Sequence, residues 1–261
     1  MTALFDEAEV RKALSGTLEQ GSVFEVRAVD AKLSGNYRTG IISGYFDNAE
    51  SCLEELEKIT SAIGVYITLN PVNPALLSRC ANRLDLAGKN ALTGDQHIVR
   101  RRELLIDVDF RRPSGISATD SEKEATRNKA NEIYRFLKER GWPEPVVADS
   151  GNGYHLRYLV DLPVEDDHLI ERLLTALADR FDGEGVELDR TVFNPSRIAR
   201  LYGTLASKGD NTLGRPHRLS KILKAPQRSR AVTPEQLQEL LDELKPAESP
   251  PAARPAAQGG G

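Results

Sequence analysis

The sequence predicts an α/β fold in which an RRM-like split βαβ sheet packs against a smaller N-terminal α/β module. Two observations favour this class. Between residues 103 and 189, strand-like segments of alternating hydrophobicity and helix-like segments of 3.6-residue period follow each other in the order β-α-β-β-α-β. Before them, residues 22–100 hold a shorter mixture of both kinds, separated by Gly, Asn and Pro.

The N-terminal part divides into short elements at its turn residues. Residues 1–21 are expected to form an acidic helical extension. The elements expected after it are strands 23–29 and 39–46 around Gly35-Asn36, a helix at 48–62, a strand at 65–69 ended by Asn70-Pro71, a short helix at 74–82 and a loop at 85–97.

The second part carries the split βαβ pattern. Its expected elements are strand 103–110, a helix opened by a Ser121-x-x-Glu124 capping box and closed by Gly141, hairpin strands 146–149 and 154–160 around Ser150-Gly151-Asn152-Gly153, helix 165–181 and strand 186–189. We therefore divide residues 22–230 into modules at 22–100 and 101–230. A leucine-faced helix is expected at 231–245, and the Pro, Ala and Gly of 246–261 predict a disordered tail or linker.

Composition places the chain among soluble globular proteins. Of its 261 residues, 39% are hydrophobic and 28% charged, and the formal net charge is −4. No stretch approaches the ~18 apolar residues that a membrane span needs, and the acidic N-terminus lacks the apolar region of a signal peptide. Two scattered cysteines, Cys52 and Cys80, favour neither a disulfide framework nor a zinc site. We expect a cytoplasmic protein without membrane partners.

The acidic average conceals a strong asymmetry. Residues 161–189 hold ten acidic residues and two arginines, whereas residues 190–230 hold ten Lys or Arg and one acid. Such a change predicts one surface suited to metal or solvent and another suited to phosphate. The alternative is a basic surface stripe without a partner.

Asp107 and Asp109 are the most informative residues. In the strand around them, Leu104, Ile106, Val108 and Phe110 alternate with the two aspartates. The apolar residues therefore face the core and both aspartates share the opposite face. Like charges side by side repel each other, and a bound cation removes that penalty. The pattern predicts Mg²⁺ or Mn²⁺ ligands; the alternative is a solvent-facing polar stripe.

The strand 186–189 repeats this alternation and ends at Asp189. In a split βαβ sheet the last strand can lie beside the first, which would bring Asp189 near Asp107 and Asp109. Three converging carboxylates can hold two metal ions ~3.5–4 Å apart. On its own, Asp189 would be an ordinary acidic residue at the edge of a turn.

His155 follows the glycine-rich turn and alternates with the apolar residues of its strand. It therefore shares a face with Arg157, and this face could also be the one that carries the aspartates. Backbone N–H groups of such a turn can approach a phosphate closely. A lone histidine is more often an ordinary surface residue. His97, His168 and His217 show no ligand spacing with it, which speaks against zinc.

Arg197 and Arg200 stand among apolar residues just after Asp189. An isolated charge there is costly, so such arginines usually pair with a carboxylate or a phosphate. Asp149 or another acid is the alternative partner. Lys208 is a further phosphate candidate. We call residues 190–230 the basic run. Its remaining members could follow a template backbone; they are Arg215, His217, Arg218, Lys221 and Lys224.

Four motifs in order resemble the archaeo-eukaryotic primase superfamily, in particular the primase–polymerase branch of phages, plasmids and other mobile elements. They are ELLIDVDF, SGNGYHL, VELD and NPSRIARLYGTLASKG, and the resemblance covers residues 23–223. The family's DxD matches Asp107 and Asp109, its sxH motif matches Ser150 to His155, and its later single Asp matches Asp189. The turn is longer here than the minimal sxH. The last motif matches Arg197, Arg200, Gly203, Thr204, Lys208 and Gly209.

This resemblance implies an enzyme, a template-directed nucleotidyltransferase that makes primers, extends them, or both. It implies that Asp107, Asp109 and Asp189 hold two Mg²⁺ or Mn²⁺ ions. The incoming dNTP or NTP would be bound by the turn and the basic motif, through Ser150, Asn152, Gly153, His155, Arg197, Arg200 and Lys208.

The expected partners are a single-stranded DNA template with its primer, and a helicase or another replication or defence module, fused or associated. Two other functions remain open on the residues alone. One is a two-metal nuclease or phosphohydrolase, which shares the carboxylates but needs no basic triphosphate pocket. The other is a non-catalytic replication-initiation module that binds DNA through residues 190–230.

Overall fold

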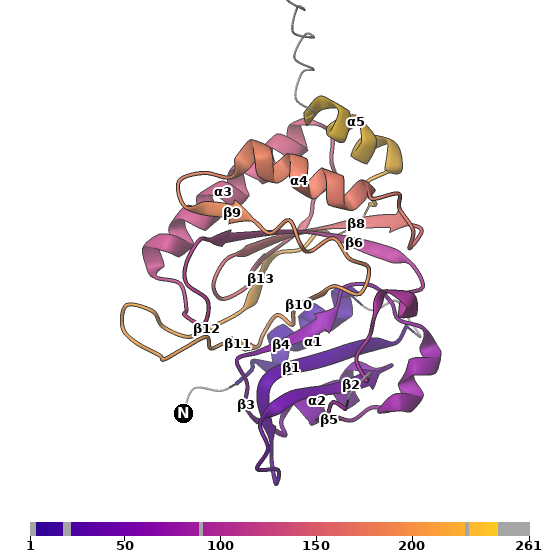
Figure 1. The fold of residues 1–261 in the computed structure, drawn as a ribbon, viewed down its shortest axis with the longest axis vertical. Coiled ribbons are helices and arrows are strands. Elements are labelled where there is room, and N and C mark those ends of the chain that lie inside the picture. Colours follow the sequence, from indigo (N-terminus) through magenta and orange to yellow (C-terminus); the bar gives the residue numbers. More distant parts are fainter. Residues whose placement is uncertain (1–3, 18–21, 89–90, 228–229, 245–261) are drawn as a thin grey trace, which may run out of the picture.

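The computed structural model describes residues 4–17, 22–88, 91–227 and 230–244. Two β-sheets lie one above the other in Figure 1, with α3, α4 and α5 on the outer side of the upper sheet. The helices α1 and α2 pack with the strands of the lower sheet in a separate core. The mixed α/β class expected from the sequence is confirmed.

The upper sheet has the strand order β13-β7-β8-β6-β9, and all its pairings are antiparallel. Its strands are β6 (Arg101–Phe110), β7 (Val146–Asp149), β8 (Tyr154–Leu162), β9 (Val186–Leu188) and β13 (Lys221–Lys224). Without the added edge strand β13, this is the split βαβ order, in which the first strand lies between the third and the last. The predicted placement of strand 186–189 beside strand 103–110 is therefore confirmed.

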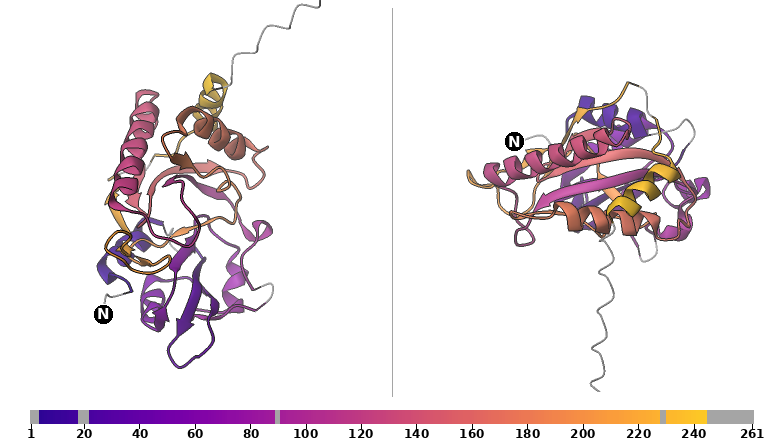
Figure 2. Two further views of the ribbon diagram at one scale, coloured as in Figure 1. Left: turned by 60° about the vertical axis from the view of Figure 1, so that its left-hand side comes forward. Right: turned by 90° about the horizontal axis from the view of Figure 1, so that it is seen from above.

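The helices α3 (Asp120–Glu139), α4 (Leu169–Phe181) and α5 (Pro234–Leu244) cover the outer face of this sheet. Seen from above in Figure 2, α3 and α4 lie across the sheet, with α5 beside α4. Leu104, Ile106 and Val108 point into the core beneath these helices, as the alternation predicts. The leucines of α5 belong to the same core, so this helix is part of the domain. The tail expected at 246–261 lies outside the described residues.

The start of α3 differs from the expectation. The cap is Thr119, whose hydroxyl accepts from the Glu122 N–H at 3.1 Å, while the Glu122 carboxylate accepts from the Thr119 N–H at 2.9 Å. The capping box therefore begins two residues before the one expected at Ser121 and Glu124. Both pairs fit the same sequence pattern, and only the chain direction after residue 118 decides between them.

The lower sheet has the order β10-β4-β1-β2-β5, and β3 pairs with β1. Its elements are α1 (Glu7–Thr17), β1 (Phe24–Leu33), β2 (Gly40–Phe46), α2 (Ala49–Leu56), β3 (Ile59–Ser61), β4 (Gly64–Thr68), η1 (Pro74–Arg79), β5 (Asp85–Leu86), η2 (Asp95–His97) and β10 (Ile198–Arg200). Two further strands, β11 (Leu205–Ala206) and β12 (Arg218–Leu219), form a separate pair.

The helix expected at 48–62 was too long, because it ends at Leu56 and the chain continues as β3. The β-branched Ile59 and Thr60 favour a strand, and β1 supplies a partner for it. The region expected as a loop at 85–97 also contains the two-residue strand β5 and the 3₁₀ turn η2.

The strand β10 matters most for the site. It follows β9 of the upper sheet in sequence but pairs with β4 of the lower sheet. The segment just after Asp189 therefore passes from one sheet to the other and carries its arginines to the boundary between them. The lower sheet draws strands from both sides of residue 100, so the division into modules at that residue stays a prediction.

Within the described residues, no helix is long and apolar enough to cross a membrane. Cys52 is buried and Cys80 half-buried, and both are free thiols.

Candidate active site

A cleft of about 290 Å³ lies where the two sheets meet, and we call it the inter-sheet cleft. The upper sheet and its turns contribute Leu105, Asp107, Asp109, Ser150, Asn152, His155, Asp189 and Val192. The lower sheet and the basic segment contribute Val29, Tyr66, Arg197, Ile198, Ala199, Arg200 and Lys208. All three predicted metal ligands and most of the predicted nucleotide-binding residues therefore line one cavity.

The three aspartates reach this cleft from adjacent strands. Asp107 and Asp109 alternate on the inner face of β6, and the Asp189 N–H donates to the Asp107 carbonyl at 2.9 Å. Burial alone would raise the pKa of Asp107. The neighbouring His155, Lys208 and Arg112 outweigh that effect and hold this pKa below its ordinary value. The carboxylate is therefore charged in a half-buried position.

The other two carboxylates are held by their own neighbours. Asp109 receives two hydrogen bonds from the Arg112 guanidinium, at 2.6 and 2.8 Å, and Asp189 accepts from the Thr191 N–H and hydroxyl at 2.8 and 2.7 Å. Among the residues that the structure describes, no group of three or more His, Cys, Asp or Glu side chains is arranged to hold a metal ion. The carboxylates share a cleft, but they do not surround a common point.

His155 lies directly opposite Asp107 across the β6–β8 pairing, and its Nε2 is 3.4 Å from the Asp107 carboxylate. The other ring nitrogen, Nδ1, is 2.8 Å from the hydroxyl of the fully buried Tyr202. Arg157, also on this face, pairs with Glu103 at 3.0 Å. The sequence analysis did not single out Tyr202 or Glu103, because nothing in the pattern indicates that residue 202 meets β8.

The turn before His155 is packed tightly against β6. A Cβ on Gly153 would lie 2.3 Å from the Val108 carbonyl, so only glycine allows this approach. The Asn152 side-chain oxygen accepts from the Ala118 N–H at 2.8 Å, and the Ser150 hydroxyl accepts from the Gly153 N–H at 3.0 Å. Ser150 and Asn152 line the cleft, whereas Gly153 lets the turn sit against the strand.

Arg200 forms the opposite wall, and its residue is only 5% exposed. Its Nη2 donates to the Tyr66 hydroxyl at 3.2 Å, and the guanidinium lies 4.5 Å from the Tyr66 ring centre. Its Nη1 is buried and, among the described residues, has no hydrogen-bond partner. Burial lowers the pKa of this arginine. A Cβ on Gly64 would lie 2.1 Å from Nη1, so a glycine makes room for the guanidinium.

Arg197 and Lys208 flank the same wall. The Arg197 Nη2 donates to the Thr191 carbonyl, while its buried Nε has no partner in the described chain. Lys208 forms no side-chain ion pair within the described residues, and its charge contributes to the lowered pKa of Asp107. The alternative partner Asp149 is bound instead by Lys123, beneath the glycine-rich turn. The cleft thus collects cationic groups without a carboxylate of their own.

None of the five residues that could follow a template lines this cleft, and Lys224 binds Glu144 at 2.5 Å. The other four lie between residues 215 and 221. Arg215 makes two hydrogen bonds to Glu122, at 2.8 and 2.9 Å, and Arg218 binds Asp120 at 2.6 Å. The His217 ring contacts the Gly209 carbonyl at 2.8 Å. Lys221 is exposed. Three of the four therefore hold the 209–218 segment in place, and their contact with template stays a prediction.

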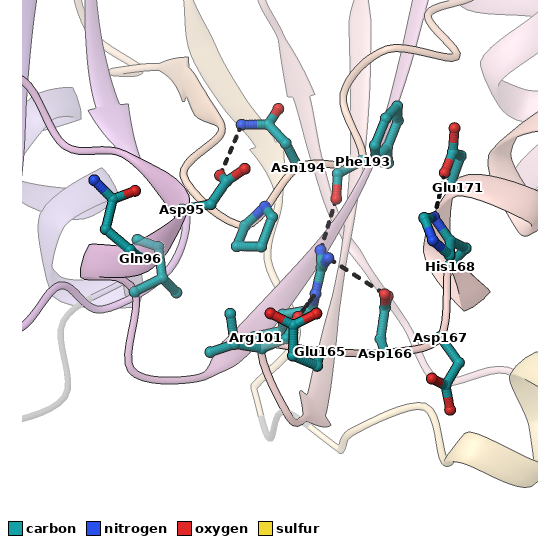
Figure 3. A pocket seen from close by; sticks show the side chains of 13 residues that line it. Asp95, Gln96, Arg101, Glu165, Asp166, Asp167, His168, Glu171, Phe193 and Asn194 are labelled. Carbon is teal, nitrogen blue, oxygen red and sulfur yellow. Dashed lines mark hydrogen bonds and ion pairs between the residues drawn. The ribbon is translucent and has the colours of Figure 1, made fainter.

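A second pocket, of about 440 Å³, lies at the other end of β6 (Figure 3). It is larger than the inter-sheet cleft and contains none of the predicted site residues. Arg101 crosses it and binds the Phe193 carbonyl at 2.6 Å, the Val164 carbonyl at 2.9 Å and Asp166 at 3.3 Å. The Arg101 guanidinium therefore binds groups of the protein itself and joins its loops.

No family model matches the sequence, and no curated protein matches it. Among solved structures, the chain is similar to the AEP domain of the cyanophage S-2L primase–polymerase, with 14% identity and a TM-score of 0.49 over 92% of this chain and 100% of that one. It is also similar to the primase RepB', with 13% identity and a TM-score of 0.47 over 91% of this chain and 62% of that one.

A third similar structure is the catalytic domain of RepB' in complex with initiator DNA, with 13% identity and a TM-score of 0.45 over 90% of this chain and 95% of that one. The likeness to these three structures concerns the fold.

Proposed function

We propose that this protein is a template-directed nucleotidyltransferase, a primase–polymerase that joins a nucleoside triphosphate to a nucleic-acid 3′ end. One observation carries the proposal. The inter-sheet cleft has carboxylates on one wall and, on the other, a buried guanidinium with an unpaired N–H group. A triphosphate with its divalent ions needs both, because phosphate oxygens bind cationic donors and the ions bind carboxylates.

The cationic wall supports an anionic ligand in particular. A buried polar group without a partner costs about 1–3 kcal/mol, and more if it is charged. The Arg200 Nη1 and the Arg197 Nε both stand in that position. Phosphate oxygens in the cleft would satisfy them, with Lys208 as a third donor.

The acidic wall fits a divalent ion by the chemistry of its donors. Asp107, Asp109 and Asp189 offer only carboxylate oxygens, which Mg²⁺ and Mn²⁺ prefer. A carboxylate has about four acceptor sites, so the two hydrogen bonds from Arg112 and the one from the Phe110 N–H leave Asp109 one site for an ion. The three side chains would have to converge from their present positions. Bound ions would stabilise charge on the transferred phosphoryl group and lower the pKa of the attacking hydroxyl.

The protein's own side chains position the substrate. Arg200 and Lys208 orient the triphosphate from the lower wall, and His155, whose Nε2 faces Asp107, lines the upper wall. This arrangement favours in-line attack by holding the phosphoryl group between the two walls. A nuclease would share the carboxylates but needs no basic pocket for a triphosphate.

Single-stranded DNA with a primer is the second substrate that we propose, and a helicase or another replication module is the expected associated partner. Lys221, exposed on the edge strand of the upper sheet, is the residue of the basic run that best supports contact with a polyanionic template.

The test is to incubate the protein with a primed DNA template, Mn²⁺ or Mg²⁺ and labelled dNTPs. Lengthening of the primer is the expected result. Shortening would indicate the nuclease instead, and a shift in mobility without any change in length would indicate a binding module. A parallel reaction on unprimed template with dNTPs or NTPs then separates priming from extension.

A further inference from the structure

A largely buried chain of five polar side chains runs along the cleft face of β6 and β8. It consists of Glu103, Arg157, Tyr202, His155 and Asp107, and we call it the buried polar chain. Arg157 donates to the Glu103 carboxylate at 3.0 Å and also to the Tyr202 hydroxyl. Tyr202 in turn contacts His155, whose far nitrogen faces Asp107.

The contacts of the Tyr202 hydroxyl fix the direction of its hydrogen bond. Because Arg157 has no acceptor, it must donate to the Tyr202 oxygen. The hydroxyl proton then needs an acceptor of its own, and within the described residues only the His155 Nδ1 is placed to receive it. If Nδ1 carried a proton instead, the Tyr202 O–H would be buried without a partner, which proteins avoid.

We propose that Tyr202 is a positioning residue that holds His155 with an unprotonated Nδ1, so that Nε2 carries the ring proton and donates into the inter-sheet cleft. That the acceptor is a phosphate oxygen of the nucleotide rests on the proposed function, whereas the tautomer of the ring does not. Asp107 favours the same tautomer while it faces Nε2. When Asp107 binds another ligand instead, Tyr202 alone keeps the His155 ring in this tautomer.

The ring state can be measured directly by ¹⁵N NMR of protein labelled at histidine, in mildly alkaline buffer. The signal of His155 is identified by its loss in His155→Gln. In the wild-type protein the expected pattern is an unprotonated Nδ1 and a protonated Nε2. A protonated Nδ1, alone or together with Nε2, overturns the proposal. Because this measurement needs no variant of Tyr202, it stands even if such a variant does not fold.

The role of Tyr202 is isolated in a background without the Asp107 carboxylate. In Asp107→Ala, the tautomer should remain as in wild type. In Asp107→Ala/Tyr202→Phe, the two nitrogens should move toward intermediate shifts, as for a mixture of tautomers. Tyr158→Phe in the same background is the matched control, since Tyr158 is an equally buried tyrosine on the opposite face of β8. An unchanged tautomer in the double variant contradicts the role of Tyr202.

Nucleotide binding supplies the second readout. Tyr202→Phe should weaken binding of a fluorescent dNTP about twofold, because a mixture of tautomers leaves about half of the molecules with a protonated Nε2, and should leave single-stranded DNA binding unchanged. Equal loss of both would contradict a positioning role. If the tautomer behaves as expected and no nucleotide binds to the wild type, the proposed function fails while the assignment of the ring stands.

Discussion

The basic run contains two groups of arginines that the structure treats in opposite ways. Arg200 is buried beside Tyr66 and has an N–H group without a partner, whereas Arg215 is partly exposed and binds the Glu122 carboxylate with both terminal nitrogens. The composition of the chain does not distinguish Arg200 from Arg215. The difference teaches that burial without an internal acceptor, and not charge alone, indicates where an anionic ligand belongs.

The largest effect is expected for Arg200→Met. Removing the guanidinium should weaken nucleotide binding by a hundredfold or more, since about two charge-assisted hydrogen bonds are lost. The free energy of unfolding should stay the same or rise, because an incompletely paired buried cation costs stability that an apolar side chain does not. Fluorescence anisotropy and denaturant unfolding measure the two quantities. A destabilised variant with intact nucleotide binding would mean that Arg200 is structural.

Arg215→Met should show the reverse behaviour. The substitution removes the ion pair with Glu122 at the start of α3 and the hydrogen bond to the Ser117 carbonyl. We expect the melting temperature to fall by a few degrees, with nucleotide binding unchanged. A loss of nucleotide binding without a change in melting temperature would break the contrast between the two arginines.

Gly64→Ala tests the position of Arg200 without altering any charge. The added methyl group would meet the guanidinium at 2.1 Å, so the arginine must move. Nucleotide binding should weaken about tenfold, the equivalent of one displaced hydrogen bond. Gly88→Ala is the matched control, because a Cβ there meets nothing within 4 Å. If both variants bind nucleotide like wild type, the proposed contact of Arg200 is wrong.

The smallest effect concerns the template. Lys221 is exposed on β13, so Lys221→Glu should weaken binding of single-stranded DNA modestly. The slope of log K against log salt should flatten by about 0.7 if one phosphate contact is lost. Arg218→Glu is a useful comparison, since this arginine is already paired with Asp120. An unchanged slope for Lys221→Glu would assign this part of the basic run to the surface alone.

The upper sheet could be predicted from local patterns. The alternation in 103–110 assigned the aspartates to the face opposite Leu104 and Ile106, and the β-α-β-β-α-β order placed the last strand beside the first. Both features depend on short-range periodicity and on a topology with few alternatives. The sequence therefore sufficed to place Asp107, Asp109 and Asp189 on adjacent strands.

Long-range contacts could not be predicted in the same way. The pairing of β10 with β4 joins residues more than a hundred positions apart, and it alone brings Arg200 to Tyr66 and Gly64. The contact of Tyr202 with His155 depends on the same crossing. The ion pair between Arg112 and Asp109 joins residues only three positions apart. Many arginines near a strand end have no such partner, however, so the sequence alone does not indicate this ion pair.

The central claim is that the carboxylates of the inter-sheet cleft perform phosphoryl transfer, and primer extension by Asp107→Ala and Asp109→Ala tests it most directly. Both side chains point away from the apolar core, so circular dichroism should report an intact fold. The account predicts that wild-type protein extends the primer with Mn²⁺ and dNTPs and that neither variant does. Substantial extension by either folded variant would contradict it.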